Sequence, residues 1–388
     1  MSDRRSFLKH AMTGSAAITA SSLIPRRIFG EQRDFYRLSY RNLGSTGAIV
    51  TEVGMGCMNM RDPELVNAAI DFGINYIDTA HAYMNGKNEE VVGQVMKTRR
   101  KEVFLTTKVK PAGGAEIRNM IETSLKRLNT DHVDLMLLHN LKSDEPVLKD
   151  ETIRAFELAK RDGLIRFAGV STHQNQAEVI DAAIGTGFWE AVLVGYNYFS
   201  PKTVGEAIKR ARIAGLATIG MKNILNPTVW PWETLDDIRK DKNSPATPAQ
   251  ALLKWVLEDM YIDTIIPGIT SFEQLRDDVA VMGMKIELSE RRKLHRFGNA
   301  INSHYCRGVA GCTECLHQCP NGVCLSDLNR CIAYANSYGD KRLAAENYDG
   351  LPKSSRIDQC SDCDECTVVC PNGIDTSRTV REARSLFG

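Results

Sequence analysis

From residue 36 to about residue 285, short apolar runs alternate with stretches in which apolar residues recur every three or four positions. The apolar runs predict β-strands, and the periodic stretches predict amphipathic helices. Several runs are almost continuously apolar, as in strands that are covered on both faces. The expected strands are residues 50–57, 75–80, 103–109, 133–140, 165–172, 191–197, 216–222 and 263–269.

A helix is expected after each of these strands. Glycine marks several helix ends, because it readily adopts the left-handed conformation that ends a helix. Eight strand–helix units in about 250 residues predict an α/β protein with a (β/α)8 TIM barrel. The alternative, a doubly wound sheet, would carry a Gly-x-Gly-x-x-Gly turn after its first strand, and none is present. The expected helices are residues 62–72, 88–98, 115–128, 151–161, 176–185, 201–214, 248–260, 272–281 and 289–299.

The composition changes abruptly near residues 300–305, where the chain becomes rich in Cys, Asn and Asp and loses its periodicity. We therefore divide the sequence into three parts. Residues 1–30 are a signal segment, residues 36–300 are the barrel, and residues 301–388 are a small Cys-rich domain of the ferredoxin-like iron–sulfur kind.

Four polar residues follow successive predicted strands. Asp78 ends the second strand, Lys108 the third and His139 the fourth, and Tyr83 lies in the loop after Asp78. Catalytic groups of such barrels collect at the C-terminal strand ends, so these four side chains are expected to meet. A buried lysine paired with a carboxylate stays cationic and lowers the pKa of a neighbouring phenol from about 10. Tyr83 would then exchange a proton with a carbonyl or alcohol oxygen that His139 orients.

Five segments carry or border these residues: Asn75-Tyr-Ile-Asp-Thr-Ala-His-Ala-Tyr83, Leu105-Thr-Thr-Lys108, Asp131-His-Val-Asp-Leu-Met-Leu-Leu-His139, Gly169-Val-Ser-Thr-His173 and Ile266-Pro-Gly268. Together they resemble the aldo/keto reductase family, and the resemblance covers residues 36–285. It implies that a nicotinamide cofactor lies extended across the barrel mouth. It also implies a catalytic tetrad with Tyr83 as the general acid/base, formed by Asp78, Tyr83, Lys108 and His139.

The resemblance also implies contacts to the nicotinamide. Ser171 and Asn197, at the ends of the fifth and sixth strands, stand where the family holds the nicotinamide and its carboxamide. Met221 and Lys222 end the seventh strand, where many members stack an aromatic ring on the cofactor. This Met-Lys pair is similar to that of barrels with ferredoxin-like tails.

The segment from Gly268 to Asp278, which includes Gln274, resembles the loop and helix that bind the adenosine phosphate. Helix N-termini favour phosphate through their exposed N–H groups. The Lys and Arg that often hold a 2′-phosphate are absent at Gly268 and Gln274. The cofactor is therefore expected to be NADP or NAD.

Ten of the eleven cysteines lie between Cys306 and Cys370. The second group has the spacing of a bacterial [4Fe–4S] site, whereas zinc sites do not require three evenly spaced cysteines followed by Cys-Pro. Its members are Cys360, Cys363, Cys366 and Cys370. The first group repeats the Cys-x3-Cys-Pro ending, so one or two clusters are expected. Its members are Cys306, Cys312, Cys315 and Cys319.

In two-cluster ferredoxins, the fourth cysteine of each group binds the other cluster. By that analogy, Cys370 joins the first group, with Cys324 or Cys331 as alternatives to Cys306. Cys319 then joins Cys360, Cys363 and Cys366.

The first residues read Asp3-Arg4-Arg5-Ser6-Phe7-Leu8-Lys9, followed by a weakly apolar run and Pro25-Arg26-Arg27. They resemble a twin-arginine export signal, and the alternative is a basic amphipathic N-terminus. The signal implies export of a folded, cofactor-loaded protein to the periplasm or the outer face of the cytoplasmic membrane. No clear cleavage site follows, so contact with the membrane is expected if the segment is retained.

The net charge of +1 provides no basic field for nucleic acid. The sequence as a whole predicts an oxidoreductase that interconverts a carbonyl and an alcohol of a small polar substrate by hydride transfer with NAD(P)(H). Its [4Fe–4S] clusters would exchange electrons with a redox partner protein. The alternative is an electron-transfer or docking subunit of a larger redox complex, with a catalytically weak barrel.

Some residues near the expected pocket allow two interpretations. His81 and His173 either touch substrate or pack, and Trp230 and Trp232 either line the pocket or anchor a loop. Cys57, far from the other cysteines, is expected to pack as a small apolar residue.

Overall fold

The strands form a curled parallel sheet whose edges meet. The computed structural model describes residues 37–388 except 232, 234, 236, 237, 239, 242–245 and 361–365. Parallel bridges join Val53 to Ile265 and Gly56 to Gly268, which connects the first strand of the sheet to the last as in a (β/α)8 barrel. The sheet runs in chain order through β3 (Met55–Gly56), β4 (Tyr76–Asp78), β5 (Phe104–Val109), β6 (Val133–Leu141), β7 (Ile165–Thr172), β8 (Ala191–Gly195), β9 (Ala217–Met221) and β10 (Thr264–Ile265).

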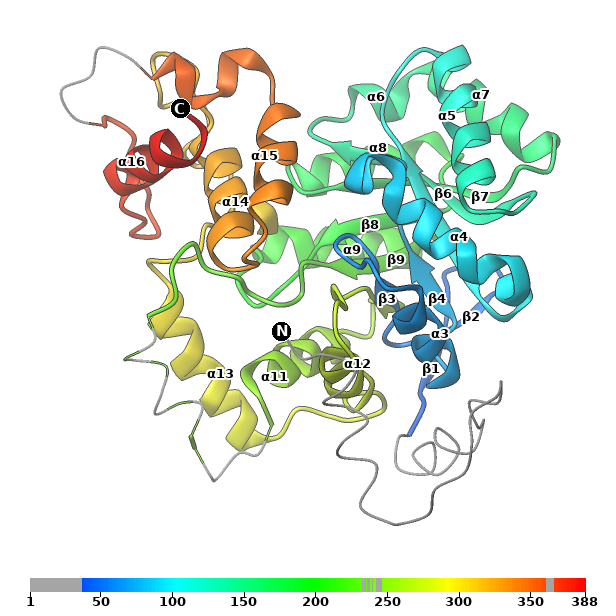
Figure 1. Cartoon of the computed structure of the whole chain (residues 1–388), viewed down its shortest axis with the longest axis horizontal. Coiled ribbons are helices and arrows are strands. Elements are labelled where there is room, and N and C mark those ends of the chain that lie inside the picture. Colours follow the sequence, from blue (N-terminus) through cyan, green and yellow to red (C-terminus); the bar gives the residue numbers. More distant parts are fainter. Residues whose placement is uncertain are drawn as a thin grey trace, which may run out of the picture.

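Helices surround these strands (Figure 1). Their starts follow local capping rules: the Asp62 side chain accepts a hydrogen bond from the Glu64 N–H, and Thr247 and Gln250 form a capping box. The helices are α3 (Pro63–Asp71), α4 (Lys87–Arg99), α5 (Gly114–Arg127), α6 (Glu145–Leu148), α7 (Asp150–Arg161), α8 (Gln176–Thr186), α9 (Lys202–Ile213), α11 (Pro248–Leu257), α12 (Phe272–Val279) and α13 (Leu288–Ile301). Short 3-10 turns are η1 (Tyr83–Gly86), η2 (Arg100–Glu102), η3 (Arg307–Ala310), η4 (Lys353–Ser355) and η5 (Ile357–Gln359).

The first expected strand, residues 50–57, is divided in the structure. Its start belongs to an antiparallel hairpin of β1 (Tyr40–Asn42) and β2 (Ile49–Thr51), and β3 follows. The hairpin buries Leu43 and Val50 against inward-facing side chains of the barrel such as Phe104 and Leu135. An apolar run that closes the barrel floor and then enters the sheet looks like one strand in the sequence, because both parts are buried.

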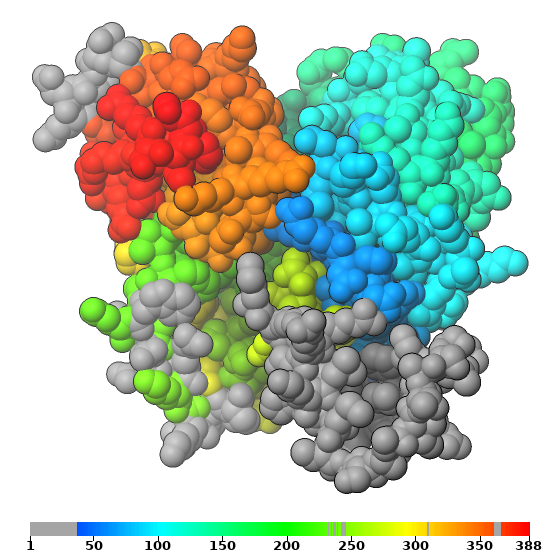
Figure 2. Space-filling view, viewed as in Figure 1, coloured from blue at the N-terminus to red at the C-terminus, as the bar shows by residue number. Residues whose placement is uncertain are grey.

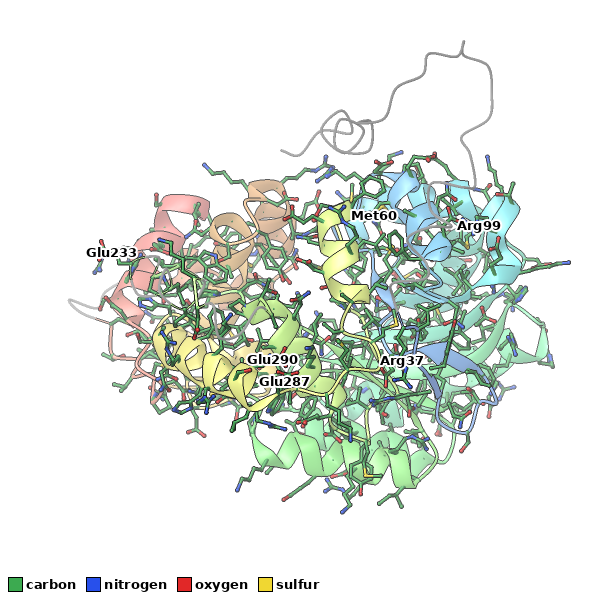
Figure 3. The ribbon with its side chains drawn as sticks, turned by 90° about the horizontal axis from the view of Figure 1, so that it is seen from below. Arg37, Met60, Arg99, Glu233, Glu287 and Glu290 are labelled. Carbon is green, nitrogen blue, oxygen red and sulfur yellow. The ribbon has the colours of Figure 1, made fainter. Side chains whose placement is uncertain are left out.

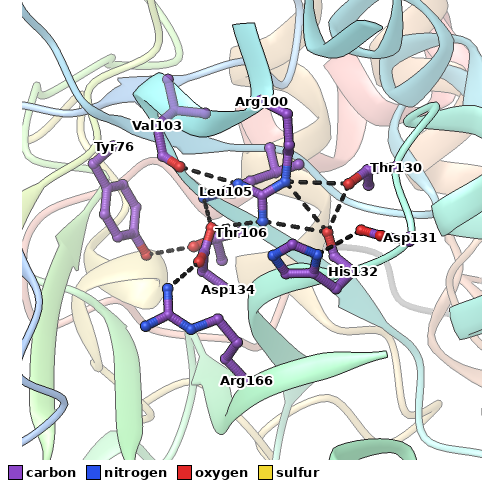
Figure 4. A network of polar contacts seen from close by, with 10 residues as sticks. All are labelled: Tyr76, Arg100, Val103, Leu105, Thr106, Thr130, Asp131, His132, Asp134 and Arg166. Atoms are coloured by element: carbon purple, nitrogen blue, oxygen red, sulfur yellow. Dashed lines mark hydrogen bonds and ion pairs between the residues drawn. The ribbon is translucent and has the colours of Figure 1, made fainter. Parts of the chain in front are cut away.

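A polar network fixes three neighbouring strands near their N-terminal ends (Figure 4). Asp134 of β6 lies between the guanidinium groups of Arg100 and Arg166, at 2.8 and 2.6 Å. The same carboxylate accepts a hydrogen bond of 2.8 Å from the Leu105 N–H of β5. These contacts set how β5, β6 and β7 stand relative to one another, and so where their opposite, C-terminal ends meet.

Helix α13 packs on α11 beside the barrel. It begins at Leu288. Glu287 and Glu290 form the capping box of this helix and lie together in Figure 3. Glu290 also accepts a hydrogen bond of 2.7 Å from Lys254 of α11, and both side chains are buried. The chain then enters the C-terminal module.

In the described part of the C-terminal module, residues 305–388, turns and irregular segments connect the helices α14 (Leu325–Asn336), α15 (Lys341–Asp349) and α16 (Thr376–Phe387). The module lies beside the barrel and touches segments from the start of the barrel sequence (Figures 1 and 2). Met58 packs against its apolar cluster, and Arg61 pairs with Asp340 at 3.4 Å. Among the described residues, every helix is too short or too polar to span a bilayer.

The close approach of α4 to the end of α5 yields a prediction. A Cβ on Gly93 would lie 2.1 Å from the Arg127 carbonyl oxygen, so Gly93→Ala must push the two helices apart. We expect it to lower the free energy of unfolding by about 1–3 kcal/mol. In the matched variant Gly185→Ala, on α8, the added methyl meets nothing within 4 Å. That variant should be neutral or more stable by about 0.5–1 kcal/mol. Denaturant midpoints of both proteins test this, and equal shifts would contradict it.

Candidate active site

The four residues of the expected tetrad meet at the barrel mouth. The Lys108 ammonium donates to the Asp78 carboxylate at 2.5 Å and to the Tyr83 hydroxyl at 3.4 Å. The Tyr83 and His139 rings stand edge to face, with 5.8 Å between their centroids. Asp78 ends β4, Lys108 lies in β5, His139 lies in β6 and Tyr83 begins η1, so the closed sheet is what brings them together.

The pKa of Tyr83 differs from the sequence-based expectation. Burial, followed by the negative charge of Asp78, raises the pKa of Tyr83 well above its usual value. The positive charge of Lys222 lowers the pKa of this phenol but does not outweigh these two effects. Tyr83 is therefore protonated near neutral pH and is ready to act as a proton donor.

Burial governs the charges of the other tetrad members. It raises the pKa of Asp78 and lowers that of Lys108, and their ion pair opposes both shifts. Burial, and then the positive charges of Lys108 and Lys110, hold the pKa of His139 well below its usual value. His139 is therefore neutral and can accept or donate a hydrogen bond without carrying charge.

A cavity of about 440 Å³ opens at the tetrad. This volume is in the range of small-molecule sites. Asp78, Tyr83 and His139 line one part of it, and the loop from Ile266 to Thr270 lines another. The C-terminal module supplies a further wall, so two parts of the chain far apart in sequence build this cavity.

Four of the seven residues that the resemblance assigned to the cofactor line the cavity: Met221, Lys222, Gly268 and Gln274. A Cβ on Gly268 would meet nothing within 4 Å, so this glycine faces open space. Asn223, whose buried side-chain oxygen has no hydrogen-bond partner in the part of the chain that the structure describes, lies beside them and was not expected.

The other three, Ser171, Asn197 and Asp278, are not among the lining residues. The Ser171 hydroxyl accepts a hydrogen bond from the Asn140 N–H at 2.9 Å. The Asn197 amide donates to the Lys222 carbonyl and to the Tyr305 hydroxyl, each at 3.0 Å. Asp278 is buried in α12, where burial raises its pKa.

The histidines and tryptophans for which the sequence allowed two interpretations differ in their positions. His173 lines the cavity, whereas His81 lies outside it and its ring nitrogen is 3.0 Å from the Ser124 hydroxyl. Trp230 packs on Phe297 and anchors its loop, and Trp232 lies outside the described residues. Cys57 is fully buried.

The sequence did not indicate the wall that the C-terminal module adds. The Lys222 ammonium donates to the Tyr334 hydroxyl of α14 at 2.9 Å, which ties the end of β9 to the module. Nothing in the sequence pairs these positions, because 112 residues separate them. The lining residues from the module are Arg330, Tyr334, Ser337, Tyr338, Asp340 and Asn347.

The cysteines gather in the module. Burial is the main cause that raises the pKa of the Cys306 thiol to about 12, and the charges of nearby Cys315, Cys370 and Cys312 contribute. Cys315, Cys319, Cys360 and Cys366 pack against one apolar cluster of the module. Cys363 lies outside the described residues, and among those that are described no three His, Cys, Asp or Glu side chains are placed to hold a metal ion.

Two Cys-Pro-Asn-Gly turns repeat one backbone geometry. The Gly322 N–H donates to the Cys319 carbonyl and the Gly373 N–H to the Cys370 carbonyl, each at 3.1 Å. Both glycines have a positive φ, of 75° and 81°, which favours glycine over other residues. The Val369 N–H donates to Gln318 at 2.8 Å, so the two turns are linked to each other.

Comparison with known proteins identifies the barrel. Residues 58–242 match the family model described as "Aldo/keto reductase family". The barrel is an aldo/keto reductase domain. The chain is 28% identical over 302 residues to "Uncharacterized oxidoreductase YqkF" of Bacillus subtilis, with 68% of this chain and 95% of that protein covered. It is 25% identical over 250 residues to "Methylglyoxal reductase DkgB" of Escherichia coli O157:H7, with 62% and 90% covered.

A solved structure agrees with this assignment. The aldo-keto reductase from Klebsiella pneumoniae in complex with NADPH superimposes with a TM-score of 0.55 at 25% identity, over 67% of this chain and 95% of that one. The present chain is an oxidoreductase of the aldo/keto reductase type, and its C-terminal module lies beyond the residues that the family model matches.

The two half-buried histidines of the aldo/keto reductase site predict a pH dependence of stability. Burial holds the pKa of His139 and of His173 well below the value near 6.5 of an unfolded chain. Below about pH 6.5 the unfolded chain takes up protons that the folded chain does not, so stability falls as the pH falls. We expect His173→Gln to reduce this slope between pH 7.5 and 5.5, measured as denaturant midpoints. An unchanged slope in the variant would contradict this account.

Proposed function

We propose that this chain reduces the carbonyl group of a small polar substrate, with NADP(H) or NAD(H) as the hydride carrier, and catalyses the reverse oxidation of the alcohol. The observation that carries the proposal is the protonated Tyr83 hydroxyl, 3.4 Å from the Lys108 ammonium, in the wall of a cavity that Asp78 and His139 also line.

The residues of the cavity suit an extended nicotinamide cofactor. Met221 offers an apolar surface for a ring, and the buried Asn223 side-chain oxygen without a partner can accept a hydrogen bond from an amide. Gly268 leaves open space, and Gln274 stands near the start of α12. The NADPH in the structural relative supports this assignment. When bound, the reduced cofactor supplies hydride for the carbonyl carbon.

The chain's own residues would handle the proton and the developing charge. His139, which is neutral, holds the carbonyl oxygen by a hydrogen bond, and Tyr83 donates its proton to the same oxygen. Lys108 and Lys222 stabilise the phenolate that remains, because both place positive charge near Tyr83. Asp78 keeps Lys108 charged and fixed.

The variant Tyr83→Phe tests this assignment. Removing the proton donor should lower kcat for methylglyoxal by about 10²–10⁴-fold while the Kd for NADPH stays near that of the parent. Tyr196→Phe is the matched control, because the Tyr196 hydroxyl binds Asp259 at 2.9 Å outside the cavity. Steady-state kinetics and NADPH fluorescence provide the data. Equal turnover by Tyr83→Phe and the parent would remove the tetrad assignment.

We further propose that the C-terminal module holds two [4Fe–4S] clusters, which supply or accept single electrons when bound. Three observations support this proposal: the cysteine spacing, the linked Cys-Pro-Asn-Gly turns, and the effect of three neighbouring thiols on the pKa of Cys306. Cys331 is fully buried in the apolar cluster of the module, so its place as a core residue favours Cys306 over Cys331 as a ligand. One ligand set is Cys306, Cys312, Cys315 and Cys370, and the other is Cys319, Cys360, Cys363 and Cys366.

The iron content of anaerobically purified protein tests the ligand sets. Two clusters require about eight iron and eight sulfide per chain. We expect Cys312→Ser and Cys360→Ser each to lower the iron count to about four and to remove different electron paramagnetic resonance signals. Cys57→Ser, outside the module, should keep about eight. A parent protein without iron would refute the cluster proposal.

The twin-arginine motif at Arg4 and Arg5 supports export as a folded, cofactor-loaded enzyme to the periplasm or the outer face of the cytoplasmic membrane. It lies outside the described residues. We propose that a redox partner protein exchanges electrons with the module there. The second candidate function, an electron-transfer or docking subunit with a weak barrel, predicts normal iron content without carbonyl turnover.

A further inference from the structure

Two cations, Lys222 and Arg330, line the cavity together with Asp78, Tyr83 and His139. Among the described lining residues the carboxylates are Asp78 and Asp340, and both are engaged in ion pairs with other cations. Neither acidic group therefore neutralises Lys222 or Arg330. The cavity has an excess of positive charge on the side that the C-terminal module closes.

Arg330 belongs to α14, and the Nε–H group of its side chain is the donor of interest here. Its guanidinium forms an ion pair with Asp327 at 3.1 Å, but Asp327 also pairs with Lys142 at 2.9 Å, so one carboxylate serves two cations. The Arg330 side chain is 10% exposed, and its Nε is buried and has no hydrogen-bond partner among the described residues. A buried donor without an acceptor is costly and calls for a ligand.

Lys222 lies close by. Its ammonium donates to the Tyr334 hydroxyl at 2.9 Å and stands 4.9 Å from the centre of that ring. Within the part of the chain that the structure describes, no carboxylate pairs with it. Because the Tyr334 hydroxyl accepts this hydrogen bond, its own proton is available to a second acceptor.

Both cations act on the place where the carbonyl would stand. After burial, the charges of Lys222 and Arg330 are the next causes that lower the pKa of His173. Arg330 also contributes to the low pKa of His139, which orients the carbonyl oxygen. His139 and Arg330 also line the same cavity, so a single small molecule in it can touch both.

We propose that Arg330, Lys222 and Tyr334 form an anion subsite, and that the substrate of this enzyme is a carbonyl compound that carries a carboxylate. The planar guanidinium with its row of donors suits a carboxylate. Because Asp327 is shared between Arg330 and Lys142, it leaves positive charge that attracts an anion. This inference rests on the proposed carbonyl reduction. The pyrophosphate of the nicotinamide cofactor has the same charge, and the test below separates the two anions.

The test compares two aldehydes of equal shape, 4-carboxybenzaldehyde and 4-carbamoylbenzaldehyde, with NADPH. We expect the parent enzyme to prefer the carboxylate by roughly tenfold to a hundredfold in kcat/KM. In Arg330→Gln this ratio should fall to about 1, mainly through KM. Arg330→Lys should keep part of the preference, because it keeps the charge without the fork. The Kd for NADPH should match that of the parent in both variants.

Lys142→Gln is the matched control. It removes the other cation of Asp327, on the barrel side and outside the cavity, and so perturbs the docking of α14 without touching the subsite. It should keep the preference for the carboxylate. If it loses the preference to the same extent as Arg330→Gln, Arg330 acts only by placing α14, and the proposal is wrong.

Other outcomes are equally decisive. Equal kcat/KM for both aldehydes in the parent would overturn the subsite but leave carbonyl reduction intact. A weaker NADPH Kd in Arg330→Gln with an unchanged aldehyde preference would assign the anion to the cofactor. If neither aldehyde turns over, calorimetry with 4-carbamoylbenzoate and terephthalamide decides. If the parent binds 4-carbamoylbenzoate more tightly than terephthalamide, and Arg330→Gln abolishes this difference, the subsite is supported although the proposed reduction has failed.

Discussion

The buried ion pair between Lys108 and Asp78 is the interaction on which the rest of the site depends. A charge buried without a partner would be very costly, so each of these residues requires the other. They come from neighbouring strands, and the pair can form only if β4 and β5 keep their register. The polar network around Asp134 at the opposite end of the barrel holds that register for β5 and β6. Tyr83 then stands beside this pair, with its hydroxyl 3.4 Å from the Lys108 ammonium.

The surroundings of Tyr83 have a chemical consequence. Burial and the negative charge of Asp78 raise the pKa of Tyr83 and keep the phenol protonated. A protonated phenol is the form required to reduce a carbonyl, whereas oxidation of an alcohol requires the phenolate. The positive charge of Lys222 opposes the effect of burial and so favours the phenolate. A residue that the C-terminal module holds in place therefore influences Tyr83, the proposed acid/base group of the barrel.

The module is thus more than an appendage that carries cysteines. Its helix α14 presents Arg330 and Tyr334 to the cavity on one side and packs Cys331 and Ile332 into the module core on the other. Cys306 and Tyr334 both border a small space next to the cavity, which places a proposed cluster ligand near the substrate site. The proposed clusters handle single electrons and a nicotinamide handles two, so such closeness makes the module a direct neighbour of the chemistry.

The barrel, and the meeting of four polar residues at its mouth, were predictable from the sequence, because their determinants are local. Apolar runs and periodic stretches specify strands and helices, and parallel strands place Asp78, Lys108 and His139 at one end of the sheet. Ser171, Asn197 and Asp278 carry the same kind of motif signal but stand outside the cavity lining, since the sequence does not specify which hydrogen bonds their side chains make within the protein. The placement of Arg330 and Tyr334 was decided by the tertiary structure alone. The contact of Lys222 with Tyr334 joins positions 112 residues apart. No local pattern in the sequence encodes how the barrel and the C-terminal module pack against each other.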